Sequence, residues 1–80
     1  MADTNLKRVI GRRIAAARVM RGMTQVELAN VLGNHPVTIS KWENGVQTPD
    51  GDTIRDMCLF LNVSADFILG LTDHVGGIHA

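Results

Sequence analysis

Apolar side chains recur at helical spacing in several separate stretches of the chain. In the first stretch they fall at i, i+4, i+8 and i+11, which places them on one face of a helix. These positions are Leu6, Ile10, Ile14 and Ala17. Asn5 precedes this run and is a good N-cap. The first helix is therefore predicted to run from there to about Met20.

A second helix is predicted over Gln25 to Leu32 from its start and stop signals. Thr24 is followed three residues later by Glu27, and T-x-x-E is the pattern of a capping box, in which two side chains satisfy backbone N–H groups at the helix start. Gly33 ends this helix, because glycine accepts the left-handed conformation that a C-cap requires.

Pro36 begins a third helix, because its missing N–H costs nothing at the first helical position. This helix is predicted to run to about Asn44. Ile39 and Trp42 lie three residues apart and are expected to point into the core, with Val46 packed against them. Two short helices joined by a glycine-bearing turn form a helix-turn-helix.

Two further helices complete the pattern. One is predicted from about Asp52 to Leu61, and a short one, capped by Ser64, from Ala65 to Leu69. The expected buried stripe of the longer helix consists of Ile54, Met57, Cys58 and Leu61. Residues 1–70 are therefore predicted to form one all-α domain, a compact five-helix bundle. The glycine-rich tail, residues 71–80, is predicted to be mobile unless a dimer orders it.

Two large apolar residues, Leu59 and Phe60, do not belong to the buried stripe of the fourth helix. They make Met57 to Leu61 apolar all round, which is unusual for a surface helix in so small a domain. The fifth helix or the tail of the same chain would be able to cover these two side chains, but we favour a second subunit. Leu59 and Phe60 are therefore the predicted homodimer interface.

The central segment carries the pattern Q-x-x-L-A-x(3)-G-x(5)-I-S-x-W-E-x-G over residues 25–45. This pattern closely resembles that of the lambda-repressor/Cro-like helix-turn-helix family of transcription regulators, and the resemblance extends from about Ile10 to Leu69. It implies a sequence-specific regulator, expected to be a repressor, that binds double-stranded DNA as a homodimer. The helix over 36–44 would enter the major groove, and the two half-sites would form a pseudo-palindromic operator.

The net charge of the chain is zero, which does not by itself favour a DNA-binding protein. The charge is unevenly distributed, however. Residues 1–45 hold seven basic side chains against three acidic ones, a net charge of +4, and residues 46–80 hold one against five, a net charge of −4. Because the positive half contains the helix-turn-helix, we interpret it as the DNA-facing half. Chance solvation of two helical faces is the alternative.

The outward face of the third helix, opposite Ile39 and Trp42, is the one that would enter the groove. The predicted base-reading residues on it are Pro36, Val37, Ser40 and Lys41. Val37 would meet a thymine methyl group, whereas Lys41 would reach either a guanine edge or a phosphate.

The resemblance also implies residues that contact the DNA backbone. Gln25 matches a family glutamine that binds a phosphate and braces the third helix, and Thr24 and Asn44 match other backbone contacts. Gln47 and Thr48, in the loop that follows, are further candidates. Such contacts would fix the register of the protein on DNA without selecting the sequence.

Other side chains have expected roles in or near this surface. In the family, the arginine that corresponds to Arg18 pairs with the glutamate that here is Glu43, so a partly buried structural ion pair is expected between the first and third helices. His35 stands where the family usually has a serine or threonine N-cap, and it would either contact a phosphate when protonated or cap weakly. Arg12 or Arg13 is a further candidate for a phosphate contact, with plain solvation as the alternative.

The remaining reactive side chains form no catalytic or metal-binding pattern. Cys58 is the single cysteine, so it makes no internal disulfide and no zinc site by itself. His74 and His79 are expected to be solvated tail residues. The sequence carries no enzyme signature, signal peptide or long apolar run, so we expect a cytoplasmic non-enzyme without a cofactor, metal or small-molecule substrate. The alternative function is a protein-interaction module, such as an antitoxin-like partner-binding bundle, with weak or no DNA binding.

Overall fold

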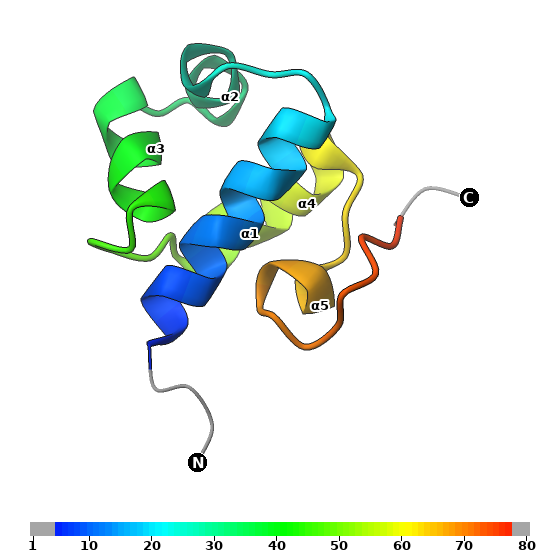
Figure 1. Cartoon of the computed structure of the whole chain (residues 1–80). Coiled ribbons are helices and arrows are strands. Elements are labelled where there is room, and N and C mark those ends of the chain that lie inside the picture. The colour runs from blue at the N-terminus through cyan, green and yellow to red at the C-terminus, as the bar shows by residue number, and fades with distance from the viewer. Residues whose placement is uncertain (1–4, 78–80) are drawn as a thin grey trace.

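A computed structural model of the chain describes residues 5–77, which fold into five α-helices with no strand (Figure 1). The helices are α1 (Leu6–Met20), α2 (Gln25–Leu32), α3 (Pro36–Glu43), α4 (Gly51–Leu61) and α5 (Ala65–Ile68). Figure 1 shows α1 crossing in front of α4, with α2 and α3 on one side and α5 on the other. The predicted all-α, five-helix bundle is confirmed. No helix in the described part of the chain is long and apolar enough to cross a membrane.

One core of apolar side chains, drawn from all five helices and from the loop before α5, lies between them. Its buried members are Ile10, Ile14, Ala17, Leu28, Ala29, Ile39, Trp42, Met57, Cys58, Leu61, Val63, Phe67 and Ile68. The inward positions expected for α1, α3 and α4 are among them, with two exceptions. Leu6, the first residue of α1, is half-exposed, and Ile54 is partly buried. Burial also raises the pKa of the Cys58 thiol, which keeps it a neutral apolar group.

Side-chain caps set the helix boundaries. The Thr24 hydroxyl accepts from the N–H of Glu27 (3.1 Å), and the Glu27 carboxylate accepts from the N–H of Thr24 (2.8 Å), so the predicted capping box of α2 is confirmed. Gly33 ends α2 with φ +67°. The fourth helix begins one residue earlier than predicted, because Asp50 caps it. The N–H of Thr53 donates to the Asp50 carboxylate and lowers the pKa of that group.

The backbones of α1 and α3 approach each other closely at Gly11. A Cβ placed on Gly11 would overlap the carbonyl oxygen of Trp42 and would lie 2.8 Å from that of Glu43. Only glycine therefore lets the middle of α1 contact the C-terminal end of α3 at this distance.

The expectation that Val46 packs against Ile39 and Trp42 is wrong. Val46 is 62% exposed. The chain reverses at Gly45 with φ +73°, and the N–H of Val46 donates to the carbonyl of Lys41 (2.9 Å). This turn sends the Val46 side chain outward.

Residues 72–75 lie against the bundle of their own chain. The Arg13 guanidinium donates to the carbonyl of Thr72 (2.7 Å) and to the carboxylate of Asp73 (2.8 Å). The carbonyl of Val75 accepts from the N–H of Ser64 (2.9 Å). The mobile or dimer-ordered tail, residues 71–80, stays a prediction, and residues 78–80, including His79, lie outside the described part of the chain.

Candidate nucleic-acid interface

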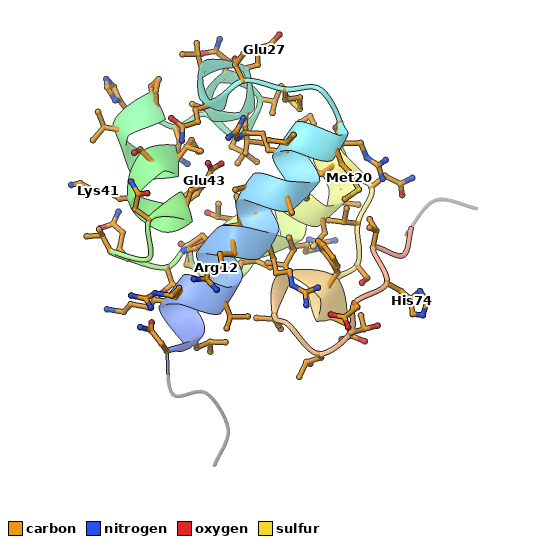
Figure 2. All side chains as sticks on the ribbon, in the orientation of Figure 1. Arg12, Met20, Glu27, Lys41, Glu43 and His74 are labelled. Carbon is orange, nitrogen blue, oxygen red and sulfur yellow. The ribbon has the colours of Figure 1, made fainter. Side chains whose placement is uncertain are left out.

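A partly buried network of polar side chains fixes α3 to α1 and α2. Two guanidinium nitrogens of Arg18 donate to the Glu43 carboxylate, Nε to Oε2 at 2.7 Å and Nη2 to Oε1 at 3.0 Å. Gln25 Nε2 donates to Glu43 Oε1 (3.0 Å), and Arg18 Nη1 donates to the carbonyl of Met23 (2.8 Å). The Arg18 and Glu43 side chains are only 15% and 7% exposed. Glu43 therefore accepts from two other helices at once, and Figure 2 shows it between α3 and α1.

This geometry is the bidentate arrangement in which arginine binds carboxylates most strongly. Hydrogen bonding to Glu43 raises the pKa of the Arg18 guanidinium, which favours the charged form of this arginine. One N–H of the Gln25 side-chain amide holds α3 through Glu43, and the backbone N–H of Gln25 at the start of α2 is a further donor for an anion.

The outward face of α3 is exposed, while its inner face is anchored. Ile39 and Trp42 are buried. On the opposite side Val37 is 53% exposed, and Figure 2 shows Lys41 pointing away from the bundle. The residues predicted to read bases thus lie on the side of α3 that faces solvent. They are Pro36 and Ser40, which are half-buried, and Val37 and Lys41, which are exposed.

Most of the residues predicted to contact phosphates gather near the C-terminal end of α3. Gln25 reaches that end through Glu43, and Asn44 follows it directly, donating to the Ser40 hydroxyl at 3.2 Å. Three more of these residues, Thr24, Gln47 and Thr48, are exposed. The hydroxyl of Thr24 is occupied by the cap of α2.

His35 caps α3 through its ring. Nδ1 accepts from the N–H of Val37 at 3.1 Å. An accepting Nδ1 requires the neutral ring with its proton on Nε2. Because His35 is exposed, Nε2–H is a donor at the N-terminal end of α3.

Two arginines of the positive half, Arg13 and Arg21, form hydrogen bonds to distant parts of the same chain that the sequence did not indicate. Arg13 binds Thr72 and Asp73 and lies over the ring of Phe67, 4.5 Å from its centroid. These contacts hold Arg13 against the segment after α5, and a phosphate contact by Arg12 or Arg13 stays a prediction. Arg21 donates to the carbonyls of Leu61 and Asn62 at the end of α4. Its position directly after α1 gave no information about the carbonyl of Leu61, which lies 40 residues away along the chain.

The described residues contain no group of three or more His, Cys, Asp and Glu side chains that could hold a metal ion. His74 is exposed, and Figure 2 shows it at the edge of the molecule, away from α3. The arrangement is therefore an exposed surface built on a rigid helix.

Comparisons with known proteins place this arrangement in a family. A helix-turn-helix family model matches residues 14–68. The HTH-type transcriptional regulator ImmR of Bacillus subtilis (strain 168) is 36% identical over 61 residues, 76% of this chain and 48% of that protein. The uncharacterized HTH-type transcriptional regulator YazB of the same strain is 39% identical over 56 residues, 70% of this chain and 81% of that protein. The chain thus spans about half the length of ImmR.

Solved structures agree in fold. The clp gene regulator ClgR from Corynebacterium glutamicum superposes with a TM-score of 0.75 at 25% identity, over 80% of this chain and 68% of that one. The hypothetical transcription factor NHTF from Neisseria superposes with a TM-score of 0.75 at 28% identity, over 81% of this chain and 73% of that one. With the partly buried Arg18–Glu43 pair and the pattern over residues 25–45, these matches show that the chain belongs to the lambda-repressor/Cro-like helix-turn-helix family of transcription regulators.

Proposed function

We propose that the chain is a sequence-specific regulator that binds double-stranded DNA as a homodimer, reads it with α3 and represses a promoter. The observation that carries this proposal is the contrast between the two sides of α3. One side is fixed by Ile39, Trp42 and the hydrogen bonds to Glu43, while the other presents exposed side chains to solvent. A rigid helix with an exposed face is what a major-groove reader requires.

Base reading is assigned to the outward face of α3. Val37 is 53% exposed and has an apolar partner in a thymine methyl group, whereas in a free protein it faces water. Lys41 extends from the same face and would donate to a guanine edge. Pro36 and Ser40 complete the set and contact bases on either side of Val37.

Backbone contacts hold α3 in register. Gln25 and Thr24 present the N-terminal end of α2, where free N–H groups and the helix dipole favour a phosphate. Asn44, Gln47 and Thr48 line the chain after α3. His35 joins them as a neutral donor, because its Nδ1 is occupied by the cap of α3 and its proton is on Nε2.

The dimer is assigned to the exposed face of α4. Leu59 and Phe60 are 44% and 57% exposed, and both are large apolar side chains. A two-fold interface brings the same patch of each subunit together, so Leu59 and Phe60 of one copy would face Leu59 and Phe60 of the other. Such a dimer would cover two half-sites about one helical turn apart, ~34 Å.

Selection of bound fragments from genomic DNA, followed by gel shifts at low and moderate salt, tests the proposal. A regulator would select related fragments, and the complexes would weaken steeply as salt rises. Failure of the folded protein to bind any fragment at low salt would refute it and favour the protein-interaction module. A promoter-reporter assay with the selected fragment then tests repression.

Replacing Lys41 with alanine is expected to relax base preference at one position of each half-site. The loss should be about 1–3 kcal/mol per half-site for the selected fragment, because a base-edge hydrogen bond disappears. Affinity for variant fragments measures this. The matched control is Arg55→Ala, which removes an exposed cation on α4, on the acidic half of the chain. A uniform loss across all sequences would make Lys41 a phosphate contact, and unchanged binding would remove it from the surface.

Replacing Leu59 and Phe60 with glutamate is expected to convert the dimer to a monomer, because like charges would meet across the two-fold axis. Sedimentation equilibrium measures the change, and affinity for a two-half-site fragment should fall while the helical circular dichroism stays the same. Val19→Glu, at an exposed apolar position on α1, serves as the control. A wild-type protein that sediments as a monomer at micromolar concentration would contradict the assignment.

A further inference from the structure

Three exposed basic side chains near the start of α1 lie outside the surface assigned to α2, α3 and the loop after α3, and only Arg12 among them is a candidate phosphate contact from the sequence. They are Lys7, Arg8 and Arg12, here called the α1 patch. None of them forms an ion pair with any residue from 5 to 77, whereas the arginines further along, at 13 and 18, each pair with a carboxylate. The α1 patch therefore holds most of the unneutralised positive charge of the described N-terminal half.

The position of this charge is unfavourable for the helix itself. Lys7 and Arg8 stand in the first turn of α1, which contains no acidic residue. The N-terminal end of a helix carries a partial positive charge, so cations there are repelled. By contrast, α2, α4 and α5 each have an acid in their first turn. Departures from a local rule of this kind are expected where a function requires them.

The α1 patch also lies beside the surface proposed to face DNA. A Cβ on Gly45, directly after α3, would be 3.2 Å from the Cα of Arg8, so the first turn of α1 packs on the end of the reading helix. Lys7 and Thr48 line the same surface hollow of about 480 Å³, together with Asn5 and Leu6. Thus α1 begins next to the loop that carries the proposed phosphate contacts Gln47 and Thr48.

We propose that the α1 patch binds the sugar-phosphate backbone of DNA beside the half-site that α3 reads. Arg8 and Arg12 are one turn apart on one face of α1, so both side chains can approach the same strand. The patch adds affinity without sequence preference, because phosphates are the same at every base pair. This inference rests on the proposed DNA binding of α3 and extends its contact area onto α1.

The test compares wild type with the triple variant Lys7→Gln, Arg8→Gln and Arg12→Gln, since glutamine keeps helix propensity and removes only charge. The probes are the fragment selected from the genome and a mixed-sequence duplex of about 30 base pairs, at about 50 and 200 mM salt. If each side chain neutralises one phosphate, the slope of log K against log salt becomes shallower by about 0.9 per residue, which is ~2.7 per subunit and ~5.4 for a dimer bound to two half-sites. The ratio of mutant to wild-type Kd should then grow ~3.5-fold per contact between the higher and the lower salt concentration.

Two controls separate binding from folding. Arg55→Gln, an exposed cation on α4 without an ion pair in the described chain, should leave the mixed-duplex slope unchanged. The triple variant should unfold at the same temperature as wild type or a higher one, because cations have left the positive end of α1. Base preference among selected fragments should not change.

Equal Kd and salt slope for wild type and triple variant, while wild type still binds its selected fragment, would overturn the role of the α1 patch and leave the proposed function intact. A loss of affinity with an unchanged slope would also overturn it, because no counterion release would have been lost. Failure of the folded wild-type protein to bind either duplex at low salt would instead overturn both proposals.

Discussion

Replacing Glu43 with alanine is expected to lower the free energy of unfolding by about 3–5 kcal/mol. The carboxylate accepts two hydrogen bonds from Arg18 and one from Gln25, and its side chain is 7% exposed. Without this carboxylate, the Arg18 guanidinium keeps only the carbonyl of Met23 as a hydrogen-bond partner. Because the Arg18 side chain is only 15% exposed, its charge would be largely shielded from water. A domain of this size is stable by roughly 4–12 kcal/mol, so much of its margin would disappear.

Chemical denaturation followed by circular dichroism measures this loss. The informative control is the double variant Arg18→Met, Glu43→Leu, which removes both charges and keeps apolar volume. It should be more stable than Glu43→Ala, because replacing a whole buried pair is often close to neutral, whereas stranding one partner is not. A single variant within about 0.5 kcal/mol of wild type would show that Arg18 reaches water easily and that the network contributes little.

Replacing Gly11 with alanine is expected to destabilise the fold by about 2–3 kcal/mol, as overpacking a close contact does. The added Cβ would overlap the carbonyl of Trp42 and approach that of Glu43, both of them backbone atoms that no side-chain rotation can move away. Helix propensity acts in the opposite direction, since alanine is favoured over glycine by about 1 kcal/mol in a helix interior. The sign of the measured change therefore tells whether α1 and α3 really touch.

The same substitution at Gly51 is the matched control. Gly51 is the first residue of α4, has ordinary helical backbone geometry, and has nothing within 4 Å of the added Cβ. Alanine there should raise stability by about 0.4–1 kcal/mol, chiefly by restricting the unfolded chain. Gly11→Ala should also weaken binding to the selected fragment, because α3 has to move away from α1. Unfolding curves in which both alanine variants gain stability would refute the close packing of the two helices.

The parts of the fold that could be predicted from sequence depend on neighbours close along the chain. Thr24 and Glu27 specify a capping box within three residues, and Gly33 and Pro36 end one helix and begin the next by their own backbone preferences. Apolar periodicity likewise identifies the inward face of α3, which leaves its outward face as the candidate reading surface. Contact of that face with DNA stays a prediction.

What could not be predicted depends on contacts between distant segments. Arg13 has no local feature that points to Asp73, 60 residues later, and the glycine at position 11 reads as a weak point in a helix until α3 is placed against it. Val46 follows the helical spacing of Ile39 and Trp42, but the chain has already turned at residue 45. Val63, in the loop after α4, lies outside any periodic run and is nevertheless fully buried.

The sharing of one carboxylate by three helices has a consequence for the thermodynamics of association. Because Glu43 binds side chains from both α1 and α2, α3 cannot tilt without carrying its neighbours with it. The surface proposed to read DNA would thus have its working shape before any duplex binds, and little conformational freedom would be lost on complex formation. Most of the change in shape on binding would then occur in the DNA. The energy needed to deform the DNA depends on its sequence, so DNA stiffness would contribute to sequence recognition.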